Sequence, residues 1–177
     1  MNKKLSVMTK YFLILSTLYF GSISFAQAEP VTLCSPNEVV FFSCPLEKSK
    51  KIVSLCESSK TANLPYLEYR FGTPQKIELR YRGLENDIPK KFNRVEVNYG
   101  SNSDEVIWFK NDSINYLLHF PMREGPLLEI IKDGNSIANF SCKEGWTNTK
   151  GDPDATLTAI EKQEDGIYVD LQKKWWK

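Results

Sequence analysis

The four cysteines are the residues whose type and spacing most clearly predict chemistry. They are Cys34, Cys44, Cys56 and Cys142. An even number of cysteines is typical of structural disulfides when a chain is exported, as the N-terminal residues described below predict. Nine and eleven residues separate the first three, and no Cys-x-x-Cys pair is present, so the spacing does not favour a zinc site. We therefore predict two disulfides, no metal and no other cofactor.

The strands expected around these cysteines bear on which of the three possible pairings forms. Segments 38–44 and 51–56 are rich in aromatic and β-branched residues, which is typical of strands. They are expected to form a hairpin in which Phe42 lies near Val53, with 45–50 as the turn. Side chains alternate between the two faces of such a hairpin.

This hairpin favours one pairing of the cysteines. Cys44 is expected at the turn end, and Cys56 at the far end on the opposite face. A disulfide needs β-carbons about 4 Å apart, so a Cys44–Cys56 bond is excluded. Cys34 enters the hairpin at the same end as Cys56. We predict Cys34–Cys56 and, by elimination, Cys44–Cys142.

Catalytic chemistry has few candidate residues. A hydrolytic triad needs a base, and His119 is the single histidine. It lies in the apolar segment 116–120, which favours a structural histidine near a strand end. No Gly-x-Ser-x-Gly elbow, phosphate loop or dinucleotide fingerprint is present. We predict that the protein is not an enzyme and has no catalytic residue.

Carboxylates near the C-terminus allow a second interpretation. Asp152 with Asp154, and the acidic group in 161–165, have the residue types of glycosidase or calcium sites. Helix capping explains them with fewer assumptions. Asp152 can cap a helix that has Pro153 in its first turn, continues over 155–163 and stops near Gly166. We predict one short C-terminal helix there.

The first 28 residues have the three parts of a secretory signal peptide. Lysines occupy positions 3, 4 and 10, an uncharged and mostly apolar stretch covers 11–25, and Ala-Gln-Ala at 26–28 forms a cleavage site. The apolar stretch is shorter than the roughly 20 residues that a membrane-spanning helix needs. We predict cleavage near Ala28, a periplasmic or secreted protein with no stable membrane insertion, and a single domain over 29–177.

Charge is unevenly distributed along the chain. The whole chain has a net charge of +1, but removal of three signal lysines leaves 20 basic and 22 acidic residues, a net charge of −2. Segment 70–94 carries seven basic and three acidic residues, whereas 144–170 carries two basic and seven acidic ones. This balance disfavours nucleic acid and favours a cationic protein partner.

Most of the mature chain alternates apolar and polar residues with the period of two that marks half-buried antiparallel strands. Asp-Gly-Asn at 133–135 is typical of a tight hairpin turn, and 83–91 is expected to be a loop. We predict an all-β antiparallel sandwich or barrel of about nine short strands. The expected strands are 38–44, 51–56, 66–71, 76–81, 94–99, 106–110, 114–120, 127–132 and 136–142.

Loops on such a rigid scaffold commonly carry recognition, and tryptophan outside the alternating pattern is a frequent interface anchor. We predict partner contacts in two loops and before the C-terminal helix. The residues are Met122, Arg123, Glu124, Trp146, Asp152 and Asp154.

Three short motifs lie in the first third of the mature chain. Phe-Ser-Cys occurs in 38–44, Val-Ser-Leu-Cys in 51–56 and Tyr-Arg-Phe-Gly in 67–72. This cluster resembles a family of small exported bacterial proteins that are mostly uncharacterised. Size, export and disulfides are also similar, in a general way, to periplasmic lysozyme inhibitors and toxin-immunity proteins. That likeness places no inhibitory motif on any residue of this chain.

These observations support one leading hypothesis on function and two alternatives. The leading hypothesis is a periplasmic protein-binding inhibitor or immunity protein that neutralises a cell-wall hydrolase or secreted toxin. The first alternative is a carbohydrate-binding or hydrolytic envelope protein that uses exposed aromatic side chains and carboxylates. The second is a structural envelope protein.

Overall fold

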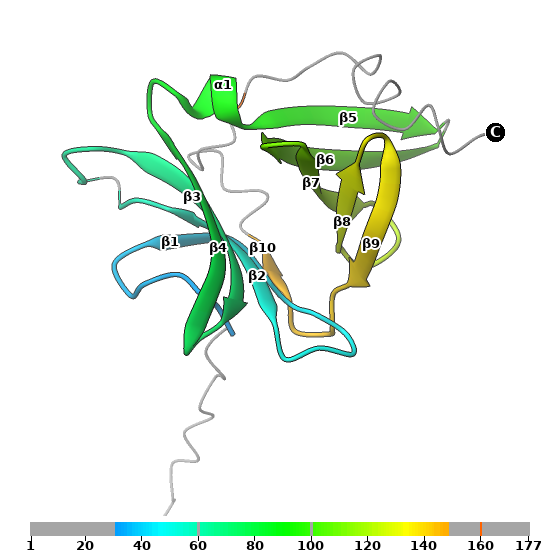
Figure 1. Cartoon of the computed structure of the whole chain (residues 1–177), viewed down its shortest axis with the longest axis horizontal. Helices are drawn as coiled ribbons and strands as arrows, with labels where there is room; N and C mark the ends of the chain where they lie inside the picture. Colours follow the sequence, from blue (N-terminus) through cyan, green and yellow to red (C-terminus); the bar gives the residue numbers. More distant parts are fainter. Residues whose placement is uncertain (1–30, 60, 100, 149–159, 161–177) are drawn as a thin grey trace, which may run out of the picture.

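The computed structural model describes residues 31–59, 61–99, 101–148 and 160. Within these ranges, ten strands form two antiparallel sheets, and Figure 1 shows the blue-to-green strands of the first beside the green-to-yellow strands of the second. The strands are β1 (Val39–Pro45), β2 (Ile52–Glu57), β3 (Tyr66–Thr73), β4 (Lys76–Leu84), β5 (Asn93–Tyr99), β6 (Asn102–Asn111), β7 (Ile114–Pro121), β8 (Leu127–Lys132), β9 (Asn135–Ser141) and β10 (Thr147–Asn148). The strand orders are β10-β1-β2-β3-β4 and β5-β6-β7-β8-β9.

The predicted fold class is confirmed, and each of the nine predicted segments contains a strand. Two short elements were not predicted. Helix α1 (Ile88–Lys91) lies within the segment expected to be a loop, and β10 has only two residues. Neither element is long enough to show a periodic pattern. No helix in the described ranges is long and apolar enough to span a membrane.

The main core lies between the two sheets. Tyr69 of β3 packs against Phe109 of β6, with ring centroids 4.7 Å apart. Phe109 also stacks with Tyr81 of β4 at 4.3 Å and with Tyr116 of β7 at 5.0 Å. These aromatic side chains come from both sheets and join them, as the alternating pattern requires.

A second apolar cluster occupies the other face of the second sheet. It contains Val95, Val97, Val106, Trp108, Leu117 and Ile131, all of them buried. Strand β6 therefore buries side chains on both faces, with Phe109 in the main core and Trp108 in the second cluster. This explains why residues 106–109 in the middle of β6 are a continuous apolar run and not a strict alternation.

Both predicted disulfides are confirmed, but the hairpin register that led to them is wrong. Cys34 is bonded to Cys56 and Cys44 to Cys142. Phe42 pairs with Leu55 and not with Val53, because the turn is tighter than expected and Leu46 N–H donates to the Lys51 carbonyl. From Phe42 to the turn the shift is two residues, and beyond the bulge between Val40 and Phe42 it is one. Cys44 pairs with Val53, and Cys56 lies three residues further along β2 and therefore on the opposite face, as the argument for the disulfides requires.

The predicted C-terminal helix over 155–163 lies outside the described residues, as do Asp152 and Asp154. Ile160 is the one residue of this segment that the structure describes. Its side chain is buried in the main core. The chain after β10 therefore returns to the space between the sheets at this residue.

Gly72 is a position where we expect a large cost from one methyl group. Its φ is +146°, and an added Cβ would lie 2.3 Å from the Lys76 carbonyl oxygen at the bulge between β3 and β4. We expect Gly72→Ala to lower the free energy of unfolding by about 2 kcal/mol or more. Gly125→Ala is the matched control, since a Cβ there meets no atom within 4 Å. Equal urea midpoints for the two variants would contradict the prediction.

Candidate functional site

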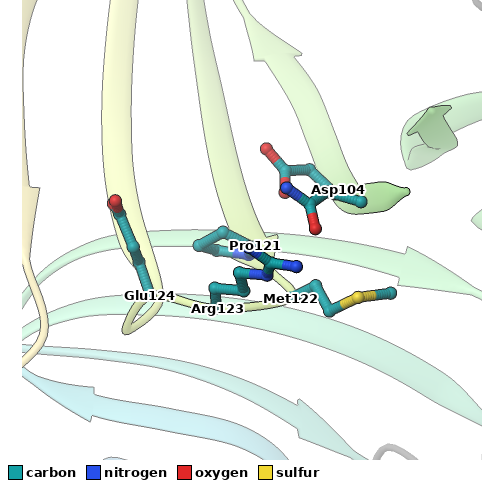
Figure 2. Close-up of a pocket in the computed structure, with 6 residues that line it drawn as sticks. Asp104, Pro121, Met122, Arg123 and Glu124 are labelled. Atoms are coloured by element: carbon teal, nitrogen blue, oxygen red, sulfur yellow. The ribbon is translucent and has the colours of Figure 1, made fainter. Parts of the chain in front are cut away.

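The loop between β7 and β8 carries three of the predicted partner contacts. Met122, Arg123 and Glu124 are exposed, and Met122 has 61% of its surface accessible. Figure 2 shows Met122 and Glu124 pointing in different directions, with Arg123 between them. Pro121 ends β7 opposite Asp104 of β6, so the loop starts from a fixed point at the end of two interior strands.

Two hollows lie beside this loop. The first has a volume of about 320 Å³ and is lined by Asn102, Asp104 and residues 121–124. The second, of about 330 Å³, is lined by the same four loop residues together with Ser103, Phe120, Pro126 and Trp146. The structure thus brings Trp146 to the loop that holds Met122, Arg123 and Glu124. We call this region, residues 121–126 with Asn102, Asp104 and Trp146, the loop site.

The second disulfide anchors the loop site. Cys142 N–H donates to the Pro126 carbonyl at 3.0 Å, and Cys142 is bonded to Cys44 of β1. Trp146 directly precedes β10, whose residue Thr147 pairs with Ser43 of β1. The loop and the tryptophan therefore belong to different sheets and meet because β1 holds both.

The loop site has the side chains of a binding surface. Trp146 is 40% exposed, and with Met122 it presents apolar area next to charges of both signs. Tryptophan and arginine are the commonest energetic anchors in protein interfaces, and methionine adapts its shape to a partner. Asp104 and Glu124 give this surface two carboxylates against the single guanidinium of Arg123.

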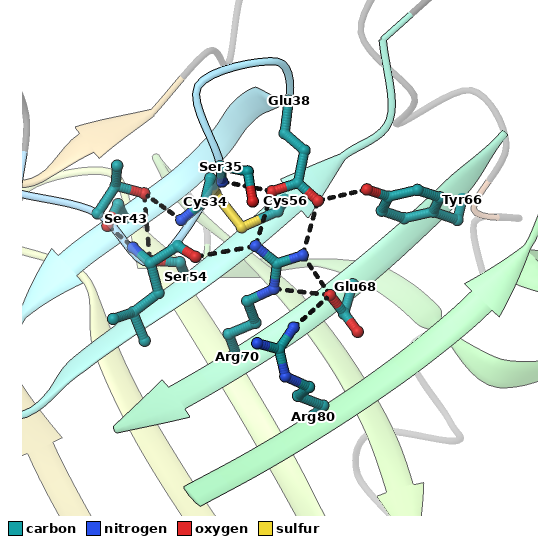
Figure 3. Close-up of a disulfide and its surroundings, with 12 residues drawn as sticks. Cys34, Ser35, Glu38, Ser43, Ser54, Cys56, Tyr66, Glu68, Arg70 and Arg80 are labelled. Atoms are coloured by element: carbon teal, nitrogen blue, oxygen red, sulfur yellow. Dashed lines mark hydrogen bonds and ion pairs between the residues drawn. A yellow bond between two sulfur atoms is a disulfide. The ribbon is translucent and has the colours of Figure 1, made fainter. Parts of the chain in front are cut away.

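A buried ionic network on the outer face of the first sheet was not predicted (Figure 3). Arg70 lies between two carboxylates, donating to both oxygens of Glu38 at 2.6 Å and to Glu68 at 2.6 Å. It also donates to the Leu33 carbonyl at 2.8 Å. Arg82 contacts Glu68 at 3.2 Å. The pattern of charges at alternate positions of β3 and β4 was the one sequence signal for it.

This network holds the acids ionised. Burial opposes ionisation of Glu38, but hydrogen bonds from Arg70, Tyr66 and the Ser35 N–H outweigh it and lower its pKa to about 2. Burial likewise opposes ionisation of Glu68, and donors on Arg82 and Arg70 lower its pKa. The Arg70 pKa is raised, because its two carboxylates outweigh the effect of burial. The network fastens segment 31–38 across the sheet.

Cys34, Glu38 and Cys56 have possible metal-ligand atoms within 4.8 Å of one another, but they do not fit a metal site. Both sulfurs are joined in a disulfide. The Glu38 oxygens already accept hydrogen bonds from Arg70, Tyr66 and Ser35. A disulfide sulfur is not a thiolate ligand.

His119 belongs to a second buried polar group, on the outer face of the second sheet. Its Nε2 lies 3.0 Å from Glu129 Oε2, and the Ser136 hydroxyl donates to Glu129 Oε1 at 2.8 Å. Both His119 and Glu129 are buried. The hydroxyl thus hydrogen-bonds the carboxylate, whereas in a hydrolytic triad it bonds the imidazole. This geometry fits the predicted structural role of His119.

Two further findings complete the description of the site. The disulfides indicate that the chain folds in an oxidising environment. In the comparisons with known proteins, no protein family, no curated sequence and no solved structure matches the chain.

Proposed function

We propose that this protein is an exported binding domain that docks a cationic protein, a cell-wall hydrolase or a secreted toxin, through the loop site and thereby neutralises it. The observation that carries the proposal is the meeting of Met122, Arg123 and Trp146 on one disulfide-anchored surface. A surface held rigid before binding loses little conformational entropy when it docks.

The charge of the loop site supports a cationic partner. Asp104 and Glu124 outnumber Arg123 around the hollows, and Glu144 is exposed two residues before Trp146. Carboxylates at the rim of an interface speed the encounter with a positively charged protein. Periplasmic or secreted localisation, which the signal peptide predicts, would bring the protein together with such hydrolases and toxins.

Removal of the Trp146 side chain tests the proposal. We expect Trp146→Ala to weaken partner binding at least tenfold, because an exposed interface tryptophan commonly contributes more than about 1.4 kcal/mol. The free energy of unfolding should change little. Leu64→Ala is the matched control, since Leu64 is 71% exposed and does not line the loop site. Binding is measured by calorimetry, and stability by urea unfolding.

The first partners to test are purified lysozyme and any toxin encoded beside the gene. We expect a molar excess of the wild-type protein to slow lysis of a peptidoglycan suspension, or to abolish the activity of the toxin. Trp146→Ala should lose this effect and Leu64→Ala should keep it. The proposal fails if neither activity changes and a photo-crosslinker at position 123 captures no protein in the native cell envelope.

Carbohydrate binding is the second candidate, and exposed Trp146 is the observation that favours it. A tryptophan face at the rim of a hollow of about 330 Å³ suits a sugar ring, and Asn102 and Asp104 are polar residues in the adjoining hollow. Soluble peptidoglycan fragments are the ligands to titrate. Saturable binding that Trp146→Ala abolishes, without any effect on hydrolases or toxins, would favour this candidate over the first.

A further inference from the structure

Strand β9 forms one edge of the second sheet. In the described part of the chain no strand pairs with it on the side away from β8. Its seven residues, Asn-Ser-Ile-Ala-Asn-Phe-Ser, include no charge and no proline. The edge strand β4 of the first sheet instead carries Lys76, Glu78, Arg80 and Arg82, all exposed. Charges and prolines are the usual features that prevent an edge strand from pairing with another chain.

The backbone of β9 directs hydrogen-bonding groups outward. Glu47 N–H donates to the Ser141 carbonyl at 2.9 Å, so this carbonyl points away from β8. Backbone groups of alternate residues in an antiparallel ladder point the same way, and those of Asn139 therefore point outward too. The β1–β2 turn thus closes the edge at Ser141 and leaves it open before that residue.

An apolar projection and a hollow lie close together on this same strand. Ile137 is 56% exposed at the position where the β8–β9 register shifts. A few residues further on, a hollow of about 250 Å³ is lined by Asn139, Phe140 and Ser141 of β9 and by Glu47 and Lys48 of the β1–β2 turn. Three residues of extended strand cover about 10 Å, so the projection and the hollow are neighbours on one edge.

We propose that two copies of this chain pair antiparallel along β9, centred on Ala138, with Ile137 of each copy seated beside the hollow of the other. A two-fold interface requires that the same surface supply both the projection and its recess, and β9 supplies both. Antiparallel pairing around Ala138 places Ile137 of one copy opposite Asn139 of the other. Because β9 is uncharged, no like charges meet in this pair.

The ends of the strand suit the same arrangement. Antiparallel pairing brings the β8–β9 turn of one copy to the β1–β2 turn of the other. The first turn carries Lys132 and Asp133, and the second carries Glu47 and Lys48, so each offers one acid and one base to its neighbour. The lining of the hollow at β9 shares no residue with the loop site, and the dimer therefore does not depend on the proposed function.

Sedimentation equilibrium of the exported, disulfide-bonded protein tests the dimer. We expect the wild-type protein to show a monomer–dimer equilibrium within a concentration range that extends to about 1 mM. Ile137→Lys should raise the dimer dissociation constant at least tenfold. Leu64→Lys places the same charge on another exposed apolar residue and should leave the equilibrium unchanged. A monomeric wild type, or an Ile137→Lys protein that dimerises like wild type, would overturn the proposal.

A second pair of variants tests the register. Asn139→Glu alone should also weaken the dimer, because it places a charge on the neutral edge. In the double variant Ile137→Lys/Asn139→Glu, the new lysine of each copy lies opposite the new glutamate of the other, and we expect recovery to within about threefold of wild type. A double variant as weak as Ile137→Lys alone would reject pairing centred on Ala138. Urea midpoints close to wild type confirm that each variant is folded.

Discussion

Replacement of Arg70 by methionine is expected to lower the free energy of unfolding by about 3 to 5 kcal/mol at pH 7. The substitution keeps most of the side-chain volume but removes the guanidinium that lies between Glu38 and Glu68. Buried Glu38 then loses its charge partner, and buried Glu68 keeps only the longer contacts with Arg80 and Arg82. The Leu33 carbonyl also loses its donor. Arg80→Met is the control, because the Arg80 side chain is 53% exposed and contacts Glu68 only at 3.3 Å. We expect it to cost less than about 1 kcal/mol.

The pH dependence separates this effect from lost packing. The Glu38 pKa is about 2 in the folded protein and 4.5 for an unperturbed glutamate, so ionised Glu38 stabilises the fold by about 3 kcal/mol above pH 5. That stability is lost as the pH falls from about 5 to 2. In Arg70→Met, protonation relieves the cost of burying the unpaired negative charge. The difference in free energy of unfolding between wild type and Arg70→Met should therefore narrow over this range. A difference in free energy of unfolding that stays constant from pH 7 to pH 3 would show that the substitution destabilises the protein only through lost packing.

Removal of the Cys44–Cys142 disulfide is expected to have the largest effect on stability. This bond joins residues 98 positions apart, and closing such a loop restricts the unfolded chain by about 4.7 kcal/mol. Cys34 and Cys56 are 22 positions apart, for which the same relation gives about 3 kcal/mol. We expect the double alanine variant at Cys44 and Cys142 to unfold at the lower urea concentration. The opposite order would contradict this prediction.

The two disulfides should also differ in their effect on binding. Cys142 positions Pro126 through its N–H, and Trp146 follows four residues later. Loss of the Cys44–Cys142 bond is therefore expected to weaken partner binding under conditions where the variant is still folded. Loss of Cys34–Cys56, which lies on the outer face of the first sheet, should leave the affinity unchanged. Calorimetry at low temperature with both double variants measures this difference.

Local patterns were sufficient to predict the strands and the disulfides, because alternation and turn residues act over a few positions. Side chains alternate between the two faces of a strand, and this alternation places Cys44 and Cys56 on opposite faces of the hairpin. That prediction was correct although the predicted hairpin register was wrong. The Asp133–Gly134 turn was likewise a local property, and both residues have positive φ.

The ionic network and the assembly of the loop site depend on contacts between distant segments. Arg70 meets Glu38 only because segment 31–38 folds back over β3, and no periodicity in that segment indicates this path. Met122 and Trp146 were each predicted for local reasons. Their meeting depends on the pairing of β10 with β1, and β10 is too short to be seen in the sequence.

The order of the cysteines along the chain has a consequence for biogenesis. The two disulfides interleave, since Cys44 lies between Cys34 and Cys56 but is bonded to Cys142. A chain that enters an oxidising compartment N-terminus first presents Cys34 and Cys44 together, well before Cys142 arrives. An oxidase acting on cysteines as they emerge would join this non-native pair, which must then be exchanged. Maturation should therefore require a disulfide isomerase, and cells without one should accumulate the mispaired, protease-sensitive form.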